Sequence, residues 1–187
     1  LSGGGAKGVA HIGVLKVLEE AGIPIDYIAG TSMGSIVGAL YAIGYDSRTM
    51  DSLVRAQNWM FLLSDKVYRY NLPFSEKEET EKYLVSVPIK NNREIKIPSG
   101  FISGQNIYNL FSDLTIGYHD TLDFHKLQIP FACVASNLVD GQEVVQDHGV
   151  LPLAMRASMA IPGVFAPVRR DGMVLVDGGI SNNFPVD

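Results

Sequence analysis

The chain has 187 residues, of which 47% are apolar and 19% charged, and its formal net charge is −5. This composition is typical of a folded protein with one sizeable core and excludes a disordered tail. The acidic balance gives no support for a nucleic-acid partner or for binding to anionic membranes through global charge.

The two ends of the chain indicate a piece of a longer protein. The chain begins without methionine at "LSGGGAKG" and stops at "NFPVD". We interpret residues 1–187 as a single domain that is truncated at both ends, so any signal peptide would lie upstream. Leu1 and Ser2 are expected to be the last residues of a strand that starts before the fragment.

The first third of the chain predicts strands and helices in alternation. Apolar residues recur at helical spacing after the first glycine run, and a second helix is apolar nearly all round, as a buried helix is. Glycines supply the stop signals of these helices. The expected elements are a loop over "GGGAKG", a helix over Val9–Ala21, a strand over Ile23–Ala29, a helix over Ser32–Ile43, and a helix from Asp46 or Ser47 to about Gln57.

The rest of the chain continues this alternation. A charged run, "SEKEETEKY", is read as a solvated face, and "EIKI" alternates as a strand. "RRDG" between two apolar runs is a hairpin turn signal. The further expected elements are a helix over Gly104–Leu114, a buried strand over Ile129–Ser136 that contains a core thiol, Cys133, a short helix in "LPLAMRASMA", and strands in "VFAPV" and "MVLVDGG".

Together these elements predict an α/β fold. Strand, loop, helix, strand, turn and helix follow one another, which favours a mostly parallel central sheet with helices on both faces. One stretch offers an alternative interpretation as a membrane span. The 19 residues from Tyr27 to Tyr45 carry no charge and are nearly long enough to span a bilayer. A buried strand, a turn and a buried helix explain that stretch as well, and we prefer them.

Two glycine motifs follow neighbouring predicted strands. "GGGAKG" supplies Gly3 to Gly8, and "GTSMG" supplies Gly30 to Gly34 with Ser32 at its centre. In a parallel sheet both loops reach the same crevice, where a serine at a sharp strand-to-helix turn exposes its hydroxyl. The bare amides of a glycine run suit a developing oxyanion. The two motifs together therefore predict an acyl-transfer site with Ser32 as nucleophile.

The first motif has a rival interpretation as a dinucleotide fingerprint. Gly3, Gly5 and Gly8 fit G-x-G-x-x-G, and Asp26 follows 18 residues after Gly8. The ribose-binding acid of that fingerprint belongs at the carboxyl end of its strand. Asp26 lies near the start of its predicted strand, at the wrong end of the sheet. The sequence therefore disfavours a nucleotide cofactor.

A base for Ser32 can be sought in two places. An α/β-hydrolase triad would use a histidine, and His119, His125 and His148 are available downstream. The other candidate is Asp177 in "VLVDGG", where an apolar strand ends in a carboxylate and two glycines allow close approach. A buried carboxylate in contact with the serine can take its proton. We prefer Asp177 and keep the histidine triad as the alternative.

In its motifs the sequence resembles the patatin-like phospholipases. "GGGAKG", "GTSMG", "ASMAIPGVFAP" and "DGG" occur in the family's order and cover the chain nearly from end to end. The resemblance implies a lipid acyl hydrolase with a serine–aspartate dyad. It gives Ser32 as nucleophile, Asp177 as base and Gly3, Gly4 and Gly5 as the oxyanion hole. The remaining motif glycines are Gly8, Gly30, Gly34, Gly178 and Gly179.

The resemblance also carries expectations about partners and location. The substrate is expected to be a phospholipid or another acyl ester at a membrane surface, with no metal and no cofactor, and the chain lacks the D-x-D-x-D-G loop of a calcium site. The region "YAIGY…NWMFLLSDK" is similar to bacterial members that are secreted or linked to the outer membrane, and a cytoplasmic location is the alternative. A lipid-binding module without turnover is the competing functional hypothesis.

Overall fold

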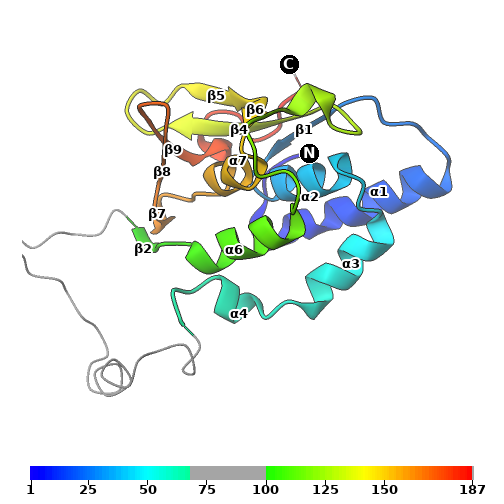
Figure 1. Cartoon of the computed structure of the whole chain (residues 1–187), viewed down its shortest axis with the longest axis horizontal. Helices are drawn as coiled ribbons and strands as arrows, with labels where there is room; N and C mark the ends of the chain where they lie inside the picture. The colour runs from blue at the N-terminus through cyan, green and yellow to red at the C-terminus, as the bar shows by residue number, and fades with distance from the viewer. Residues whose placement is uncertain (68–99, 187) are drawn as a thin grey trace, which may run out of the picture.

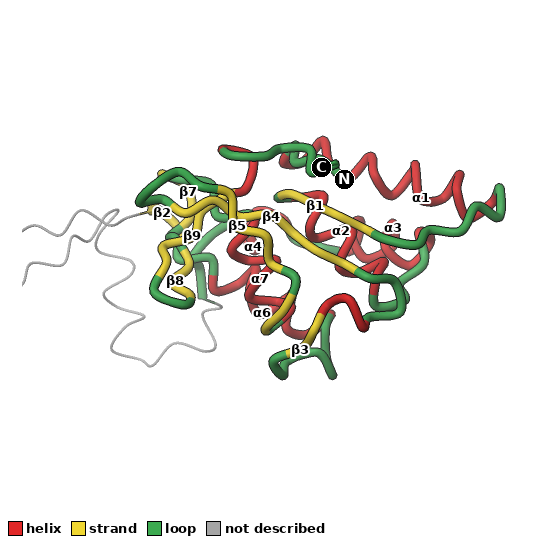
Figure 2. The backbone as a smooth tube through the Cα atoms, turned by 90° about the horizontal axis from the view of Figure 1, so that it is seen from above, coloured by secondary structure: helices red, strands yellow, loops and turns green. Residues whose placement is uncertain are grey.

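The structure is a computed structural model that describes residues 1–67 and 100–186. A mixed five-stranded sheet lies along one side of this part of the chain, with helices stacked against it (Figure 1). Seen from above, the sheet overlaps α6 and α7, whereas α1 runs beside β1 and extends beyond the sheet (Figure 2). The helices and helical turns are η1 (Gly5–Val9), α1 (Ala10–Glu20), α2 (Met33–Ala42), α3 (Ser47–Ala56), α4 (Trp59–Leu62), α6 (Gln105–Leu114), η3 (Phe124–Lys126), α7 (Leu151–Ser158) and η4 (Gly178–Ile180).

Strand β4 is the centre of the sheet. The strands are β1 (Ile28–Thr31), β2 (Gly100–Ile102), β3 (Leu122–Asp123), β4 (Phe131–Asn137), β5 (Glu143–Gln146), β6 (His148–Gly149), β7 (Gly163–Phe165), β8 (Val168–Arg170) and β9 (Met173–Asp177). β1 pairs with β4 along residues 131–134, and β9 pairs with it along residues 135–137. β5 pairs along residues 133–136, which overlap both, so β5 occupies the opposite edge. β1 and β9 therefore lie end to end along one edge of β4.

The expectation of a mostly parallel sheet is wrong. β1 runs parallel to β4, whereas the β4–β5, β4–β9 and β8–β9 pairs are antiparallel. Short turns rather than helices join β4 to β5 and β8 to β9, and such hairpin connections reverse the strand direction. The hairpin predicted from "RRDG" is confirmed, with Asp171 and Gly172 at φ 51° and 76° in its turn.

The expectation of helices on both faces of the sheet also needs correction. α2 and α7 pack on the sheet and against each other, which places both on one face. Ala135 of β4 packs with Ala157 of α7, so the next residue, Ser136, points to the other face. There its hydroxyl contacts Ser181, which directly follows η4. In the described residues, a 3₁₀ turn rather than a long helix covers that face of β4.

The predicted helices of the first half are confirmed, with ends that differ by one or two residues, as α1, α2 and α3. Asp46 caps α3, because its carboxylate accepts a hydrogen bond from the Thr49 amide at 2.7 Å. The strand expected over Ile23–Ala29 is wrong for most of its length, since β1 begins at Ile28. The Ile23 amide still belongs to the turn that ends α1, and donates to the Leu18 carbonyl at 3.0 Å.

The second half follows the predictions closely. α6, β4, α7 and β9 appear where helices and strands were expected, whereas the short strands β2, β3, β5 and β6 were not anticipated. The charged run "SEKEETEKY" and the strand expected at "EIKI" lie outside the described residues. Among the helices of the described ranges, none has both the length and the apolar character needed to cross a bilayer, and Tyr27–Tyr45 divides into β1 and α2.

Leu1 extends the sheet beyond β1. Its amino group donates to the Ala29 carbonyl at 2.6 Å, and its carbonyl accepts from the Thr31 amide at 3.1 Å. This is the bonding pattern of a parallel pair, and it agrees with the strand ending expected at Leu1 and Ser2. The pairing places the glycine run that follows Leu1 beside the end of β1.

Candidate active site

Ser32 occupies the single residue between the end of β1 and the start of α2. Its backbone has φ 52° and ψ −119°, a conformation that is rare for a residue with a side chain. Such strain costs on the order of 1–3 kcal/mol and is concentrated at functional sites. The residue is only 7% exposed. This is the sharp strand-to-helix turn that "GTSMG" predicts.

The glycines on either side allow this turn to close. A Cβ atom on Gly30 would lie 2.5 Å from the carbonyl oxygen of Gly34. A Cβ atom on Gly34 would collide with the carbonyl oxygen of Leu1, in the pairing that extends the sheet. Both collisions involve backbone atoms, which cannot move aside as the end of a flexible side chain can. The motif glycines are therefore required by packing around Ser32.

Asp177 lies in direct contact with Ser32. The Ser32 hydroxyl donates a hydrogen bond to Oδ2 of Asp177 at 2.6 Å. The second carboxylate oxygen, Oδ1, accepts from the Gly179 amide at 2.7 Å, which fixes the orientation of the carboxylate. Asp177 is 8% exposed, so the contact is largely shielded from water. The structure thus brings together the two residues that were predicted as nucleophile and base.

The strand register explains how the two residues meet. Thr31, at the end of β1, lies opposite Val134, and Asp177, at the end of β9, lies opposite Ala135. Because β1 and β9 approach each other along the same edge of β4, their ends face across a short gap. Gly178 then turns the chain against the Val134 carbonyl, where a Cβ atom would collide. The antiparallel direction of β9 is therefore what delivers Asp177 to Ser32.

The glycine-rich loop lies against the same turn. A Cβ atom on Gly3 would lie 3.1 Å from the Cβ of Ser32, and one on Gly8 would lie 2.6 Å from the Cβ of Met33. The Gly3 amide donates to the Asn183 carbonyl at 3.1 Å. In the part of the chain that the structure describes, the amides of Gly4 and Gly5 donate no hydrogen bond. Of the three amides predicted for the oxyanion hole, Gly4 and Gly5 are available and Gly3 is occupied.

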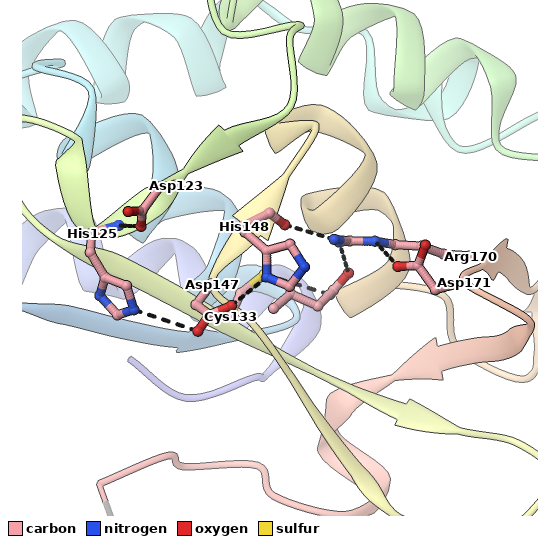
Figure 3. A network of polar contacts seen from close by, with 8 residues as sticks. Asp123, His125, Cys133, Asp147, His148, Arg170 and Asp171 are labelled. Carbon is pink, nitrogen blue, oxygen red and sulfur yellow. Dashed lines mark hydrogen bonds and ion pairs between the residues drawn. The ribbon is translucent and has the colours of Figure 1, made fainter.

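Two histidines that could have served a triad lie in a separate surface network (Figure 3). Nδ1 of His148 contacts Oδ1 of Asp147 at 2.6 Å, and Nε2 of His125 lies 3.5 Å from Oδ2 of the same carboxylate. The hydrogen bond from His148 is the main reason why the pKa of Asp147 is lowered. These histidines are engaged with Asp147 rather than with Ser32.

The other two histidines contact backbone carbonyls. Nε2 of His11 lies 2.8 Å from the Ser2 carbonyl oxygen, and Nε2 of His119 lies 2.8 Å from the Ser112 carbonyl oxygen. Since all four histidines are in the described ranges, the contacts of Ser32 can be compared with each of them. Its hydroxyl meets the Asp177 carboxylate and no imidazole.

Ser32 lines an apolar cavity of about 500 Å³. Gly5 of the glycine loop also lines it, so nucleophile and candidate oxyanion loop open into the same space. α2, α3 and α6 supply nearly half of its lining residues. Apart from Ser32 and Gln57, the side chains around it are apolar or aromatic, among them Ile36, Val37, Leu40, Met50, Leu53, Val54, Trp59, Leu63, Ile107, Leu110, Phe111, Leu114, Met159, Ile161, Val164 and Phe165.

Three contacts around the dyad were not anticipated from the sequence. The Ser32 amide donates to the Ser158 hydroxyl at 2.9 Å, and the Thr31 hydroxyl donates to the Asn182 carbonyl at 2.9 Å. The Asn183 carbonyl accepts from Gly3, as described above. Ser158 belongs to the block "ASMAIPGVFAP", which was noted only as a resemblance. No local pattern marks a buried hydroxyl as the partner of an amide 126 residues away in the chain.

The remaining chemistry-bearing groups of the described residues do not form a metal site. Among residues 1–67 and 100–186, no group of three or more His, Cys, Asp or Glu side chains is placed to hold a metal ion. Cys133 is buried in β4, and burial raises the pKa of its thiol to about 12. Asp26, the acid of the rival nucleotide interpretation, is exposed and precedes β1.

Comparison with known proteins adds family information to this geometry. The profile of the family described as patatin-like phospholipase matches residues 1–187. Lysophospholipase NTE1 of Eremothecium gossypii is 32% identical over 191 residues, which cover 100% of this chain and 10% of that protein. An uncharacterised NTE family protein of Mycobacterium bovis is 32% identical over 187 residues, covering 100% and 27%. The chain thus spans about a tenth to a quarter of the length of these relatives.

Solved structures share the fold. VipD from Legionella pneumophila aligns with a TM-score of 0.61 at 18% identity, over 98% of this chain and 46% of that chain. The type III effector protein ExoU aligns with a TM-score of 0.50 at 21% identity, over 85% of this chain and 39% of that chain. At these identities the likeness supports the same α/β architecture with a mixed sheet.

Proposed function

This chain belongs to the patatin-like phospholipase family, and from that premise we propose that it is a lipid acyl hydrolase whose nucleophile is Ser32 and whose base is Asp177. One observation carries the proposal. The Ser32 hydroxyl donates to the Asp177 carboxylate at 2.6 Å, and Ser32 lines an apolar cavity. A nucleophile within hydrogen-bond reach of a base, beside a site that fits an acyl chain, is what ester hydrolysis requires.

The reaction proceeds in two steps. Ser32 Oγ attacks the carbonyl carbon of the ester while Asp177 takes the hydroxyl proton, and the leaving alcohol departs with a proton returned by Asp177. Water, deprotonated by the same carboxylate, then attacks the acyl-enzyme, and the proton passes back to Oγ as the fatty acid leaves. A carboxylate that serves as base in one half-step is the acid in the next, as microscopic reversibility demands.

The amides of Gly4 and Gly5 are proposed to hold the oxyanion in both steps. They are free of other hydrogen bonds within the described residues, and Gly5 lines the cavity beside Ser32. Fixed amide donors of this kind typically contribute 10²–10³-fold to turnover. Gly3 is assigned a supporting role, because its amide is occupied by the Asn183 carbonyl and it packs directly on Ser32.

The cavity favours a substrate with a long acyl chain. Its volume of about 500 Å³ lies within the range of ligand pockets, and its wall is almost free of polar groups that would have to be desolvated. Several of the similar proteins are named lysophospholipases. We therefore propose a phospholipid or lysophospholipid substrate at a membrane surface.

A fluorophosphonate probe tests the nucleophile. The wild-type chain should react stoichiometrically at Ser32, as located by peptide mass spectrometry, and Ser32→Ala should remain unlabelled. Ser47→Ala is the matched control, since Ser47 is also a buried serine but its hydroxyl bonds Glu19 between α1 and α3, and this variant should still be labelled at Ser32. Equal labelling of Ser32→Ala and wild type would refute the assignment.

The competing hypothesis is a lipid-binding module without turnover. It predicts that the chain binds phospholipid vesicles but releases no fatty acid from phospholipids or from short-chain esters. Our proposal predicts release of fatty acid from both, at the same rate with and without EDTA. Profiling the fatty acids freed from defined phospholipids and lysophospholipids would identify the preferred substrate, and release from neutral esters alone would remove the phospholipase assignment.

A further inference from the structure

Both members of the dyad are held by one short segment at the end of α7, residues 158–160. The Ser32 amide donates to the Ser158 hydroxyl at 2.9 Å, and the Asp177 amide donates to the Ala160 carbonyl at 2.9 Å. The two bonds originate two residues apart in the chain. The end of α7 therefore fixes the backbone of the nucleophile and the backbone of the base relative to each other.

The Ser158 hydroxyl has a fixed orientation. It is completely buried, and it donates its own proton to the Val134 carbonyl at 2.6 Å. Since a hydroxyl has one proton, the oxygen must present a lone pair to the Ser32 amide. Val134 lies opposite the last residue of β1. The hydroxyl thus links the turn at Ser32 to β4, the strand that pairs with β9, which carries Asp177.

This link acts on the strained part of the nucleophile. Ser32 has φ 52°, and a strained backbone persists only where its surroundings over-determine it. The Ser158 hydroxyl accepts a hydrogen bond from the Ser32 amide and so fixes the orientation of the peptide plane that precedes Ser32. The direction of the Ser32 side chain depends on that orientation. Without an acceptor, the buried amide would gain by turning towards another partner, and the Ser32 hydroxyl would move with it.

We infer that Ser158 is a positioning residue for the nucleophile: its hydroxyl holds the Ser32 amide so that Oγ stays in line with the Asp177 carboxylate. Ser158 does not line the cavity, so it has no contact with the acyl chain there. The inference rests on the proposed function for its kinetic consequence, but the contact between the two residues can be tested without turnover.

Ser158→Ala tests the kinetic consequence against a matched control. Because small displacements of a reacting group can cost up to about 10²-fold, kcat should fall by about 10–100-fold with KM within about twofold. Ser47→Ala is the control. Ser47 is also a buried serine, and its hydroxyl bonds Glu19 between α1 and α3, away from the dyad. The control should keep wild-type kcat, and equal kcat in all three proteins would overturn the inference.

A second variant covers the possibility that Ser158→Ala does not fold. Ser158→Cys keeps nearly the same volume but offers a weak acceptor. It should retain the wild-type melting temperature and still lose kcat, and Ser158→Thr, which keeps the hydroxyl, should recover activity relative to Ala. Wild-type kcat in the Cys variant, or loss of the fold in both the Ala and Cys variants, would assign Ser158 to folding rather than to positioning.

Hydrogen exchange at the Ser32 amide separates this inference from the proposed function. In Ser158→Ala that amide should exchange at least about tenfold faster, because its acceptor is gone, while the amides of β4 keep their rates. This readout needs no substrate. An unchanged Ser32 rate overturns the positioning role, whereas a faster rate in a protein without esterase activity overturns only the proposed function.

Discussion

Because Ser32 contacts Asp177, the activities of two variants, Asp177→Asn and His148→Gln, distinguish a dyad from a histidine triad. Asp177→Asn keeps the shape of the side chain and one oxygen for the Gly179 amide, but removes the proton acceptor. We expect kcat/KM on a soluble ester to fall by about 10²–10⁴-fold, the range typical of losing a general base. The melting temperature should change little, because replacing a buried charge by a group of the same shape is often tolerated.

His148→Gln is the counterpart at the same scale. His148 contacts Asp147 on the surface and does not reach the serine, so this variant should keep most of the activity. A histidine triad requires the reverse order, with His148→Gln inactive and Asp177→Asn only mildly impaired. A folded Asp177→Asn enzyme with full activity would send the search for a base back to the histidines.

At the scale of elements, the surroundings of two helical glycines predict that the same substitution, Gly→Ala, changes the stability of the fold in opposite directions in α2 and in α1. Gly34 of α2 lies against the Leu1 carbonyl, where an added Cβ would collide. Gly34→Ala should therefore destabilise the fold by about 1–3 kcal/mol, as over-packing does. Gly13 of α1 has no atom within 4 Å of the corresponding Cβ position. Gly13→Ala should stabilise the fold by about 0.5–1 kcal/mol, through helix propensity.

Thermal unfolding of the two alanine variants beside the wild type checks this pair. A melting temperature that falls for Gly34→Ala and rises for Gly13→Ala fits the packing described. Two shifts of the same sign would contradict it, because the substitutions are chemically identical and differ only in what surrounds them.

Acid should weaken the connection between the end of α4 and the start of α6. The Asp65 carboxylate accepts from the Ser103 amide at 2.7 Å, from the Ser103 hydroxyl at 2.6 Å and from the Gly104 amide at 3.3 Å. Burial alone would raise the pKa of Asp65, but these hydrogen bonds and the nearby charge of Arg156 lower it below its ordinary value of 3.8.

The sign of the pH effect follows from that shift. Because the folded chain holds this proton less tightly than the unfolded chain, the contribution of Asp65 is fully present above the unfolded pKa and is lost as pH falls through the folded pKa. Asp65→Asn should therefore lower the unfolding free energy at pH 7 by about 0.5–1 kcal/mol, as expected for an exposed site. The gap to the wild type should close below about pH 4 in urea titrations; a constant gap would be inconsistent with this account.

For the molecule as a whole, the cavity predicts a dependence on acyl-chain length. The lining residues of the turn and of α2 extend from Ser32 to Leu40, which at 1.5 Å per residue is about 12 Å along the helix. Leu40→Phe adds volume at the far end from the nucleophile. It should lower kcat/KM for a long-chain ester by about 10-fold or more while a butyrate ester keeps its rate, since a short chain does not reach Leu40.

The butyrate rate in the same variant serves as the internal control for folding and for the dyad. If Leu40→Phe slows both esters equally, the cavity does not hold the acyl chain and the change has disturbed the site as a whole. If it slows neither, the chain takes another route away from Ser32.

Local sequence determined the reactive parts of this protein. Glycine at positions 30 and 34 permits a turn that a larger residue would prevent, so "GTSMG" indicates the strained serine without knowledge of the fold. Apolar periodicity indicated α1, because one face of that helix must be buried, and α2 was indicated because it is apolar nearly all round, as a buried helix is. The carboxylate of Asp177 at the end of an apolar strand was likewise visible as a candidate base.

Tertiary structure decided how these parts meet. Asp177 was expected at the edge of a parallel sheet, but it arrives on an antiparallel strand that ends opposite Ala135, beside the end of β1. Pairing direction and register depend on contacts between segments that are distant in the chain, as β4 is from both β1 and β9, and no local pattern records these contacts. The same is true of Ser158, of the Asn183 carbonyl that occupies the Gly3 amide, and of the cavity, because each exists only where distant segments pack together.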